Sequence, residues 1–377
     1  MIDICCIVGT RPNLIKLNCL YKSLRKYFNV TLIHTGQHKS SNMNTIFFQQ
    51  LNIPPPNYYL HADTSLSPAG NMNDELYNNN FNTKNIGRII QELLSSDNLG
   101  QIGDIRQKLK PLFQNINPNL VIVFGDVTST LAGALCAFDM NIPIAHIESG
   151  LRSGDLTMPE EVNRILVDYM STYYFISEPS GISHLLYEGY KEHIYLVGNT
   201  MIDTLYSIVD KCTKPIFNNY ILITLHRPSN VDNTLCIDGI LHDLKLLSDK
   251  YTIVFPIHPR TRKNIIIEDY PYIHFIEPQG YIDFISLIKY SQFVITDSGG
   301  IQEETTALDI PCFTLRNNTE RPFTLMGTNS LIGSINDIDY NCLNDINNMA
   351  CTKKNSIQTL WDGNCSERIT KLLVKLL

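Results

Sequence analysis

Short apolar runs alternate with longer stretches of helical periodicity along most of this 377-residue chain. Such runs, rich in Ile and Val, are typical of strands that are buried on both faces. Because strands that alternate with helices form parallel sheets, the pattern predicts an α/β fold with doubly wound sheets. The strand candidates are Ile2–Val8, Val30–His34, Leu120–Phe124, Ile144–Ile147, Tyr220–Leu225, Thr252–Pro256, Ile273–Ile276, Phe293–Thr296 and Cys312–Leu315.

The alternation stops and then restarts in the middle of the chain. The break lies between Phe175 and Lys214, and a length of 377 residues also favours two domains. We therefore expect two similar sheets with a cleft between them. One segment, Asn71–Asn85, is rich in Asn and weakly periodic, so it is predicted to be a loop, with a functional lid as the alternative.

The composition is that of a globular protein. Hydrophobic residues make up 44% and charged residues 18% of the chain, and the mean hydropathy is −0.07. No apolar run reaches the about 18 residues of a membrane span, and the apolar part of the N-terminus is too short for a signal peptide. The net charge of −7 argues against a nucleic-acid partner, which would require a basic face.

The ten cysteines show no pattern of a metal site. No pair has CxxC spacing, and no cluster of His residues completes a zinc motif. Several lie inside apolar runs, such as Cys5, Cys6 and Cys312, where cysteine behaves as a small apolar residue. We expect a reduced, cytoplasmic protein without a bound metal.

Polar residues that directly follow the strands are the candidate site residues, because ligands bind at the carboxyl ends of strands in such sheets. After the first strand come Gly9, Thr10 and Arg11, with Lys16 one helical turn later. A glycine turn, a helix N-terminus and two cations form a plausible phosphate site. The alternative is that Arg11 and Lys16 are ordinary surface charges.

Two further strands of the first half end in acids, Asp126 and Glu148, and Glu160 and Glu161 follow shortly afterwards. A carboxylate that is partly desolvated at a strand end has a raised pKa, which suits proton transfer. The alternative for Asp126 is an N-cap of the next helix. For Glu160 and Glu161, which follow a proline, the alternative is a helix start. Asp126, Glu148 and an acid of the Glu160–Glu161 pair would place three acids at one sheet edge, which favours a catalytic role.

The second half of the chain supplies groups of a different kind. Two strands end in His226 and His258, although a single histidine after a strand is more often structural. The run VITDSGGIQEETTAL predicts a strand, a glycine turn at Gly299 and Gly300, and a helix. Such a turn can bind a diphosphate, and Glu304 one turn into the helix could bind a ribose. The sequence therefore predicts a nucleoside diphosphate ligand.

The chain resembles the family of non-hydrolysing UDP-N-acetylglucosamine 2-epimerases. The matching motifs run in order over nearly the whole chain: GTRP at Gly9–Pro12 with Lys16, TGQH at Thr35–His38, GDVTST at Gly125–Thr130, HIESGLRSGD, MPEEVNR, VGNTMIDTL, TLHRPSNVD, FPIHPRTRK, TDSGGIQEETTAL, NNTERP and WDG at Trp361–Gly363.

The resemblance implies a GT-B fold, with two Rossmann-like domains and a last helix that crosses back onto the first. On this basis we expect domains at residues 1–178 and 179–365 and a terminal helix at 366–377. It also implies inversion at C2 of UDP-GlcNAc to give UDP-ManNAc, by elimination of UDP to 2-acetamidoglucal and re-addition. No cofactor is expected. The implied partners are a UDP-sugar substrate and a second copy of the chain in a homodimer.

The resemblance also implies roles for individual residues. It assigns catalytic roles to Asp126, Glu148, Glu160 and His226. It assigns substrate binding to Arg11, Lys16, Gln279, Phe284, Ser298, Gly299, Gly300, Glu304 and Arg321. One position departs from the family pattern, since Asn13 replaces the acid that usually follows GTRP.

Several alternatives remain at this point. One is a 2-epimerase of a 6-deoxy UDP-HexNAc, because the contacts to C6 cannot be identified from motifs. Others are a hydrolysing epimerase, a GT-B glycosyltransferase that uses the same donor, and a non-catalytic sensor of UDP-sugars. The set of Asp126, Glu148 and Glu160 argues against a glycosyltransferase and against a sensor. The intact GTRP and TERP motifs argue against hydrolysis, because they suggest that UDP is held for re-addition.

Overall fold

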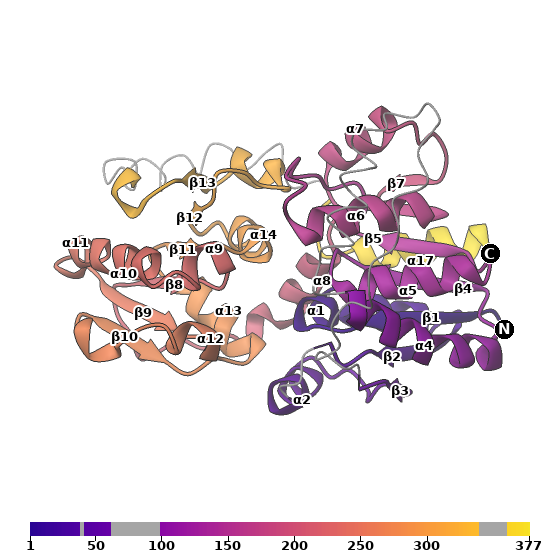
Figure 1. The fold of residues 1–377 in the computed structure, drawn as a ribbon, viewed down its shortest axis with the longest axis horizontal. Helices are drawn as coiled ribbons and strands as arrows, with labels where there is room; N and C mark the ends of the chain where they lie inside the picture. The colour runs from indigo at the N-terminus through magenta and orange to yellow at the C-terminus, as the bar shows by residue number, and fades with distance from the viewer. Residues whose placement is uncertain (38–40, 62–98, 339–359) are drawn as a thin grey trace. The chain divides into compact units, whose positions relative to one another are not determined.

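The structure, a computed structural model, describes residues 1–37, 41–61, 99–338 and 360–377 (Figure 1). The chain divides into two compact units, Met1–Thr200 with Cys365–Leu377, and Met201–Asn364. Each unit contains one parallel sheet, of seven strands in the first and six in the second. The predicted fold class, an α/β protein with two Rossmann-like sheets, is confirmed.

The sheet of the first unit has the strand order β3-β2-β1-β4-β5-β6-β7, and all its strand pairs are parallel. The central strands β1, β4 and β5 are almost entirely buried because helices pack against the sheet. Their bounds are β1 Asp3–Val8, β2 Asn29–His34, β3 Tyr58–Tyr59, β4 Leu120–Phe124, β5 Ile144–Ile147, β6 Tyr173–Ile176 and β7 Ile194–Leu196.

Helices of the first unit connect these strands. A continuous apolar core joins α4, α5 and α6 to one face of the sheet through residues such as Phe113, Leu131 and Val167. Burial of this apolar area is the main stabilising contribution to the unit. The helices are α1 Arg11–Leu24, α2 Ser41–Gln50, α4 Leu99–Ile116, α5 Thr128–Asp139, α6 Pro159–Met170, α7 Pro179–Tyr187 and α17 Cys365–Leu376.

The last helix, α17, returns to the first unit and packs on α1. Ile369 and Leu373 are fully buried there, and Arg368 Nε donates to the carbonyl of Val197 at 2.7 Å. The first unit also extends to Thr200, beyond the expected boundary at 178, because β7 pairs with β6 in the same sheet.

The second unit has the strand order β10-β9-β8-β11-β12-β13, again with parallel pairs. Its core contains Phe255, Phe293 and Phe313 together with aliphatic residues of α10. The strands are β8 Tyr220–Thr224, β9 Thr252–Pro256, β10 Ile273–Ile276, β11 Val294–Thr296, β12 Cys312–Leu315 and β13 Asn329–Ile332. The α-helices are α8 Thr200–Ile208, α9 Pro228–Val231, α10 Thr234–Asp243, α11 Lys245–Ser248, α12 Pro259–Arg262, α13 Tyr281–Lys289 and α14 Gly299–Ala307. The 3-10 helices are η1 Val209–Lys211, η2 Ile267–Asp269, η3 Pro322–Met326 and η4 Ile335–Asp337.

The sequence predicted nine of these strands and missed β3, β6, β7 and β13, which have two to four residues each. The segment Asn71–Asn85, which was predicted to be a loop, lies outside the described residues. Within the described ranges, no helix has both the length and the apolarity that a membrane span requires. The same ranges contain no group of three His, Cys, Asp or Glu side chains arranged to hold a metal ion.

The cysteines that the structure describes are mostly core residues. Cys5, Cys6, Cys136 and Cys312 are buried thiols. Burial raises the pKa of Cys5 and of Cys312 to about 12, so both stay protonated at neutral pH. This agrees with their interpretation as small apolar residues.

Candidate active site

The turn between β1 and α1 brings Lys16 to the carboxyl edge of the first sheet. Lys16 is buried, and its Nζ pairs with Glu148 Oε2 at the end of β5. The alternative of an ordinary surface charge is therefore wrong for Lys16. Arg11, the first residue of α1, is half-buried and lies over the Phe47 ring at 5.8 Å. Burial lowers the pKa of Arg11, yet the guanidinium remains a cation.

Asn13, the residue that departs from the family pattern, has a structural role in the same turn. Its Oδ1 accepts hydrogen bonds from the backbone N–H of Gly9 at 3.1 Å and of Thr10 at 3.3 Å. Its Nδ2 donates to the carbonyl of Phe124, the last residue of β4, at 2.9 Å. An ionised carboxylate could accept the first two bonds but could not donate the third. Asn13 thus links the β1–α1 turn to the strand end that precedes Asp126.

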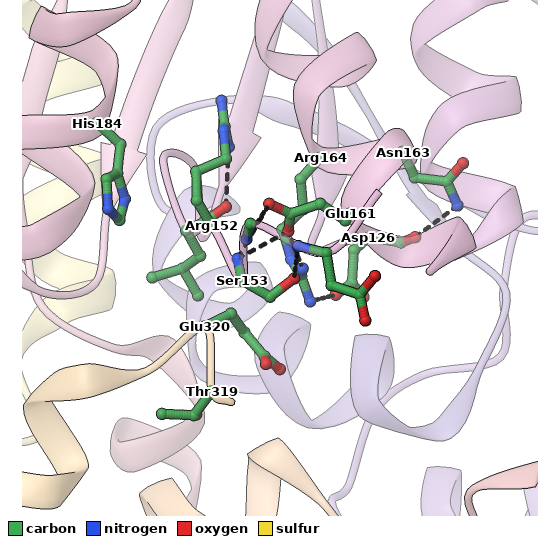
Figure 2. Close-up of polar contacts among 12 residues, drawn as sticks. Asp126, Arg152, Ser153, Glu161, Asn163, Arg164, His184, Thr319 and Glu320 are labelled. Atoms are coloured by element: carbon green, nitrogen blue, oxygen red, sulfur yellow. Dashed lines mark hydrogen bonds and ion pairs between the residues drawn. The ribbon is translucent and has the colours of Figure 1, made fainter. Parts of the chain in front are cut away.

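Asp126 lies directly after β4 and is held by α6. Its carboxylate pairs with Arg164 Nη2, and its backbone carbonyl accepts from Asn163 Nδ2 at 2.7 Å (Figure 2). The alternative role as N-cap is wrong, because α5 begins at Thr128 and Val127 occupies the cap position. Asp126 is therefore an oriented carboxylate at the strand end.

Glu148 lies directly after β5 and has a left-handed backbone conformation, with φ of 72°. Non-glycine residues adopt this conformation infrequently, and it is often found at functional sites. Its ion pair with Lys16 lies against Gly125, where a Cβ would come within 2.7 Å of Lys16 Nζ and 3.2 Å of Glu148 Oε2. A side chain at position 125 would therefore have to displace the end of Lys16, and the positive φ of 63° there also favours glycine. The ends of β4 and β5 therefore present Asp126 and Glu148 at one sheet edge, as predicted.

The two adjacent acids at the start of α6 have different environments. Glu160 is exposed, whereas Glu161 is buried and accepts from the backbone N–H groups of Ser153 and Gly154 at 2.9–3.0 Å. Glu161 also pairs with Arg164 Nη1 at 2.8 Å (Figure 2). Glu161 therefore fixes the loop before α6, and Glu160 remains available to a ligand. Both lie in the first turn of α6, as the helix-start alternative also predicts.

A buried group that we did not predict from the sequence lies behind these acids. His146 Nδ1 pairs with Asp168 Oδ1 at 2.6 Å, and Arg152 Nη1 lies 2.8 Å from Asp168 Oδ2. Burial alone would raise the pKa of Asp168, but Arg152 and His146 hold that pKa well below its usual range. A signal was present, because His146 interrupts an otherwise apolar strand two residues before Glu148.

In the second unit, His226 follows β8 and is oriented by Asp297, which follows β11. His226 Nδ1 lies 3.1 Å from Asp297 Oδ1, and the imidazole is 53% exposed. Burial would raise the pKa of Asp297, but hydrogen bonds from His226, Arg227 and Asn230 lower it below the ordinary value. The result is an accessible imidazole fixed by a buried carboxylate. We did not select Asp297 as a site residue from the sequence.

The two glycines that were predicted as a turn, Gly299 and Gly300, are the first residues of α14, and Gly299 packs against a network of buried charges. Arg321, itself 5% exposed, pairs with Glu303 at 2.9 Å and with Glu320. A Cβ at Gly299 would collide with Arg321 Nη1 and would lie 2.7 Å from Glu320 Oε1. Arg321 therefore lies at the predicted diphosphate turn. Ser298 directly precedes the helix, and Gly300 is its second residue.

Glu304 lies on α14, fully buried, and accepts a hydrogen bond from Tyr281 Oη at 2.9 Å. Burial raises its pKa to about 8, and the neighbouring Glu303 acts in the same direction, so the carboxyl binds its proton at neutral pH. Phe284 is half-buried on α13, and Gln279 just before that helix donates to the carbonyl of Glu277 at 2.6 Å.

The chain is similar to known proteins over nearly its whole length. A family model described as UDP-N-acetylglucosamine 2-epimerase matches residues 69–374. A UDP-N-acetylglucosamine 2-epimerase of Methanocaldococcus jannaschii is 36% identical over 390 residues, covering 97% of each chain. A UDP-2,3-diacetamido-2,3-dideoxy-D-glucuronate 2-epimerase of Pseudomonas aeruginosa is 35% identical, covering 98% of this chain and 99% of its own.

Solved structures agree with the sequence matches. The crystal structure of the Methanocaldococcus jannaschii UDP-GlcNAc 2-epimerase in complex with UDP-GlcNAc and UDP superposes with a TM-score of 0.79 at 33% identity. That match covers 99% of this chain and 100% of the other. The family model and the full-length relatives, together with the acids at the first sheet edge, lead to one conclusion. The chain belongs to the UDP-N-acetylglucosamine 2-epimerase family.

Proposed function

We propose that this protein is a non-hydrolysing epimerase that interconverts UDP-GlcNAc and UDP-ManNAc. The observation that carries the proposal is the pair of carboxylates at the edge of the first sheet, in a chain of this family. Asp126 faces Arg164 and Glu148 faces Lys16, so each acid lies beside a cation. Two oriented carboxylates are what a reaction with proton removal and proton return requires.

The chemistry explains why such groups are needed. The C2 hydrogen of the sugar is not adjacent to a carbonyl, so direct deprotonation to a stable carbanion is very difficult. Anti elimination avoids this problem, since the C2–H and C1–O bonds break, a C1=C2 double bond forms and UDP leaves. Re-addition returns UDP to C1 and a proton to the opposite face of C2. The sugar is neither oxidised nor reduced overall, so no redox cofactor is required.

In this proposal the first unit supplies the groups that act at C2. Asp126, Glu148 and Glu160 exchange protons with the sugar, while Arg11 and Lys16 stabilise the negative charge that develops on the leaving diphosphate. Lys16 can serve both purposes because it already pairs with Glu148.

The second unit then supplies the nucleotide-binding groups. Ser298, Gly299 and Gly300 at the start of α14 would bind the diphosphate, because the first N–H groups of a helix have no partner within it. Arg321 packs on this turn. We assign ribose binding to Glu304 and place Gln279 and Phe284 beside the uracil, with His226 as a further active-site residue.

A second candidate is a 2-epimerase whose UDP-sugar differs from UDP-GlcNAc at C3 or C6. The Pseudomonas aeruginosa relative named for a diacetamido glucuronate is about as identical to this chain as the relative named for UDP-GlcNAc. Overall sequence identity therefore does not show which substituents the sugar carries at C3 and C6. A 6-deoxy UDP-HexNAc is another UDP-sugar that differs from UDP-GlcNAc in this way. Assays with UDP-GlcNAc, its 6-deoxy analogue and its uronate at equal concentration would rank the three by kcat/KM.

We also propose a cytoplasmic location and a homodimer. The location follows from the substrate, a nucleotide sugar, and from the buried thiols of Cys5, Cys6 and Cys312, which pack as core residues. The homodimer rests on the family resemblance. Light scattering of the purified protein should give twice the chain mass of 42.9 kDa, and a mass of one chain would contradict it.

Product analysis tests the reaction type. With UDP-GlcNAc alone, proton NMR should show a UDP-ManNAc signal approaching a fixed ratio to the substrate, with both sugars still bound to UDP. UDP and free ManNAc as main products would indicate a hydrolysing enzyme instead. Transfer of the sugar to an added acceptor, without epimer formation, would indicate a glycosyltransferase.

A further inference from the structure

Asp168 is the centre of a buried cluster that the proposed chemistry does not use. It lies on α6 with no exposed surface and has four partners around its two oxygens. Ser149 Oγ donates to Oδ1 at 2.5 Å, and His146 Nδ1 lies 2.6 Å from the same oxygen. The Gly150 backbone N–H donates to Oδ2 at 3.0 Å, and Arg152 Nη1 lies 2.8 Å from it.

His146 connects this carboxylate to the loop that carries Asp126. Its Nε2 lies 2.9 Å from the carbonyl oxygen of Gly125, the residue before Asp126. A carbonyl oxygen can only accept, and the Asp168 carboxylate can only accept as well. Both ring nitrogens of His146 therefore face hydrogen-bond acceptors, and the imidazole bridges the two loops.

Residues of the same cluster lie shortly before and directly after Glu148 in the chain. His146 lies two residues before it, and Ser149 and Gly150 follow it directly, so three of the four partners of Asp168 flank this acid. Glu148 itself has the uncommon φ of 72°. Backbone in this region persists only where surrounding contacts impose it. The cluster around Asp168 supplies such contacts.

We propose that Asp168 and His146 are positioning residues that fix the backbone of Glu148 and, through the Gly125 carbonyl, the start of the Asp126 loop. This inference rests on the proposed function, because it gives Glu148 and Asp126 a common orientation at C2. In the proposed role, Asp168 and His146 do not contact the sugar. They act by keeping two acids in place while protons move.

The first test is the isosteric change Asp168→Asn, which removes the negative charge and leaves an amide facing His146. We expect kcat for epimerisation to fall about 10²-fold, since small displacements of catalytic groups have effects of this size. KM and the affinity for UDP should change less than twofold. The control is Asp139→Asn, in an exposed pair with Arg106 of the same unit, which should keep the wild-type kcat. An unchanged kcat for folded Asp168→Asn would overturn the proposal, and so would an equal loss of UDP affinity.

Ser149→Ala provides a milder variant in case Asp168→Asn does not fold. It removes one hydrogen bond to Asp168, and we expect a fall in kcat of about fivefold at constant KM. In a Glu148→Gln background, the same change should lower the residual rate by a smaller factor, because the acid that it positions is already absent. Full additivity of the two changes would contradict a role through Glu148.

A spectroscopic test does not depend on activity. Nitrogen NMR of the wild-type protein labelled at histidine should show one imidazole with both nitrogens protonated at pH 7, and this signal should be absent in His146→Gln. A neutral His146 would overturn the inference. If the wild-type protein shows no epimerisation while this signal is present, the proposed function fails and the buried ion pair stands. If epimerisation is normal and the signal is absent, the proposed function stands and the proposed role of Asp168 and His146 fails.

Discussion

Asp126 and Glu148 differ from ordinary surface carboxylates because each ends a buried strand and faces a cation. Arg164 holds Asp126, and Lys16 holds Glu148. Such pairs fix the orientation of the two carboxylates. The reaction that we propose depends on these two side chains more than on any others in the first unit.

The variant Asp126→Asn tests whether Asp126 transfers a proton in the reaction. The amide keeps the shape of the side chain but cannot accept a proton, so the rate of epimerisation should fall by about 10²–10⁴. Binding of UDP, measured by calorimetry, should remain close to wild type. Asp139→Asn serves as the control. A variant that retains more than a tenth of the wild-type rate would contradict a role in proton transfer.

Glu304 offers a prediction about protons and binding. Its pKa of about 8 means that it is mostly protonated at pH 7. Ribose hydroxyls donate to an ionised carboxylate, so binding favours the anion and lowers this pKa. Binding of UDP-GlcNAc at pH 7 should therefore release protons, and affinity should rise as the pH increases toward 8.

Calorimetry in buffers of different ionisation enthalpy would measure this release. The Asp126→Asn background allows UDP-GlcNAc to be used without turnover. Addition of Glu304→Gln should abolish the dependence on the buffer. Equal proton release with and without Glu304 would show that another group is responsible.

At the scale of single residues, the sequence could indicate where polar groups follow strands, and this led to Asp126, Glu148 and Glu304. The sequence could not indicate which other side chains form ion pairs or hydrogen bonds with the residues at the site. The acid of Asp168 lies in a helix far along the chain from His146, and only the fold brings them together. For the same reason, the pattern of strands and helices could not separate Glu160 from Glu161, whose exposure depends on the loop at Ser153. Only the family resemblance selected Glu160.

The start of α14 is the element on which nucleotide binding depends in this account. Gly299 is packed under the paired side chains of Arg321 and Glu320, whereas a Cβ at Gly300 would come no nearer than 3.4 Å to any atom, the nearest being Met201 Cε. The two adjacent glycines therefore have different steric requirements. Sequence motifs alone would treat them as equivalent.

Gly299→Ala should destabilise the protein by about 1–3 kcal/mol, because the new methyl group must displace a buried, paired guanidinium. Gly300→Ala, the matched variant, should leave the free energy of unfolding unchanged or slightly higher, since Ala favours helix. Urea unfolding followed by circular dichroism would compare them. Equal stability of the two variants would contradict the close packing of Arg321 on Gly299.

The lengths of the strands explain which of them could be predicted from the sequence. Long apolar strands such as β1 and β4 were predicted because buried parallel strands have continuous hydrophobic runs. β3, with two residues, and β7, with three, are too short for a recognisable pattern.

At the scale of the whole molecule, the chain ends in the unit in which it begins. α17 covers α1 and has a strongly two-sided pattern, with Ile369 and Leu373 fully buried and Val374 47% exposed. The first unit therefore depends on the last residues of the sequence for part of its core. This crossing was expected from the family resemblance and not from periodicity.

Leu373→Ala should cost about 2–5 kcal/mol of unfolding free energy, because it removes a fully buried side chain from a packed contact. Val374→Ala, the neighbouring position on the exposed face of the same helix, should change it by less than about 0.5 kcal/mol. Urea titrations with the same probe would give both values. Comparable losses from the two variants would show that α17 does not pack as described.

In the proposed reaction, UDP leaves and returns while the proton at C2 exchanges with solvent. The most direct measurement is proton NMR of UDP-GlcNAc with the enzyme in D2O. We predict that the UDP-ManNAc formed carries deuterium at C2 and that the recovered UDP-GlcNAc gains deuterium there with time, without net release of UDP. Formation of UDP-ManNAc that retains the original hydrogen at C2, or loss of UDP in proportion to turnover, would contradict this account.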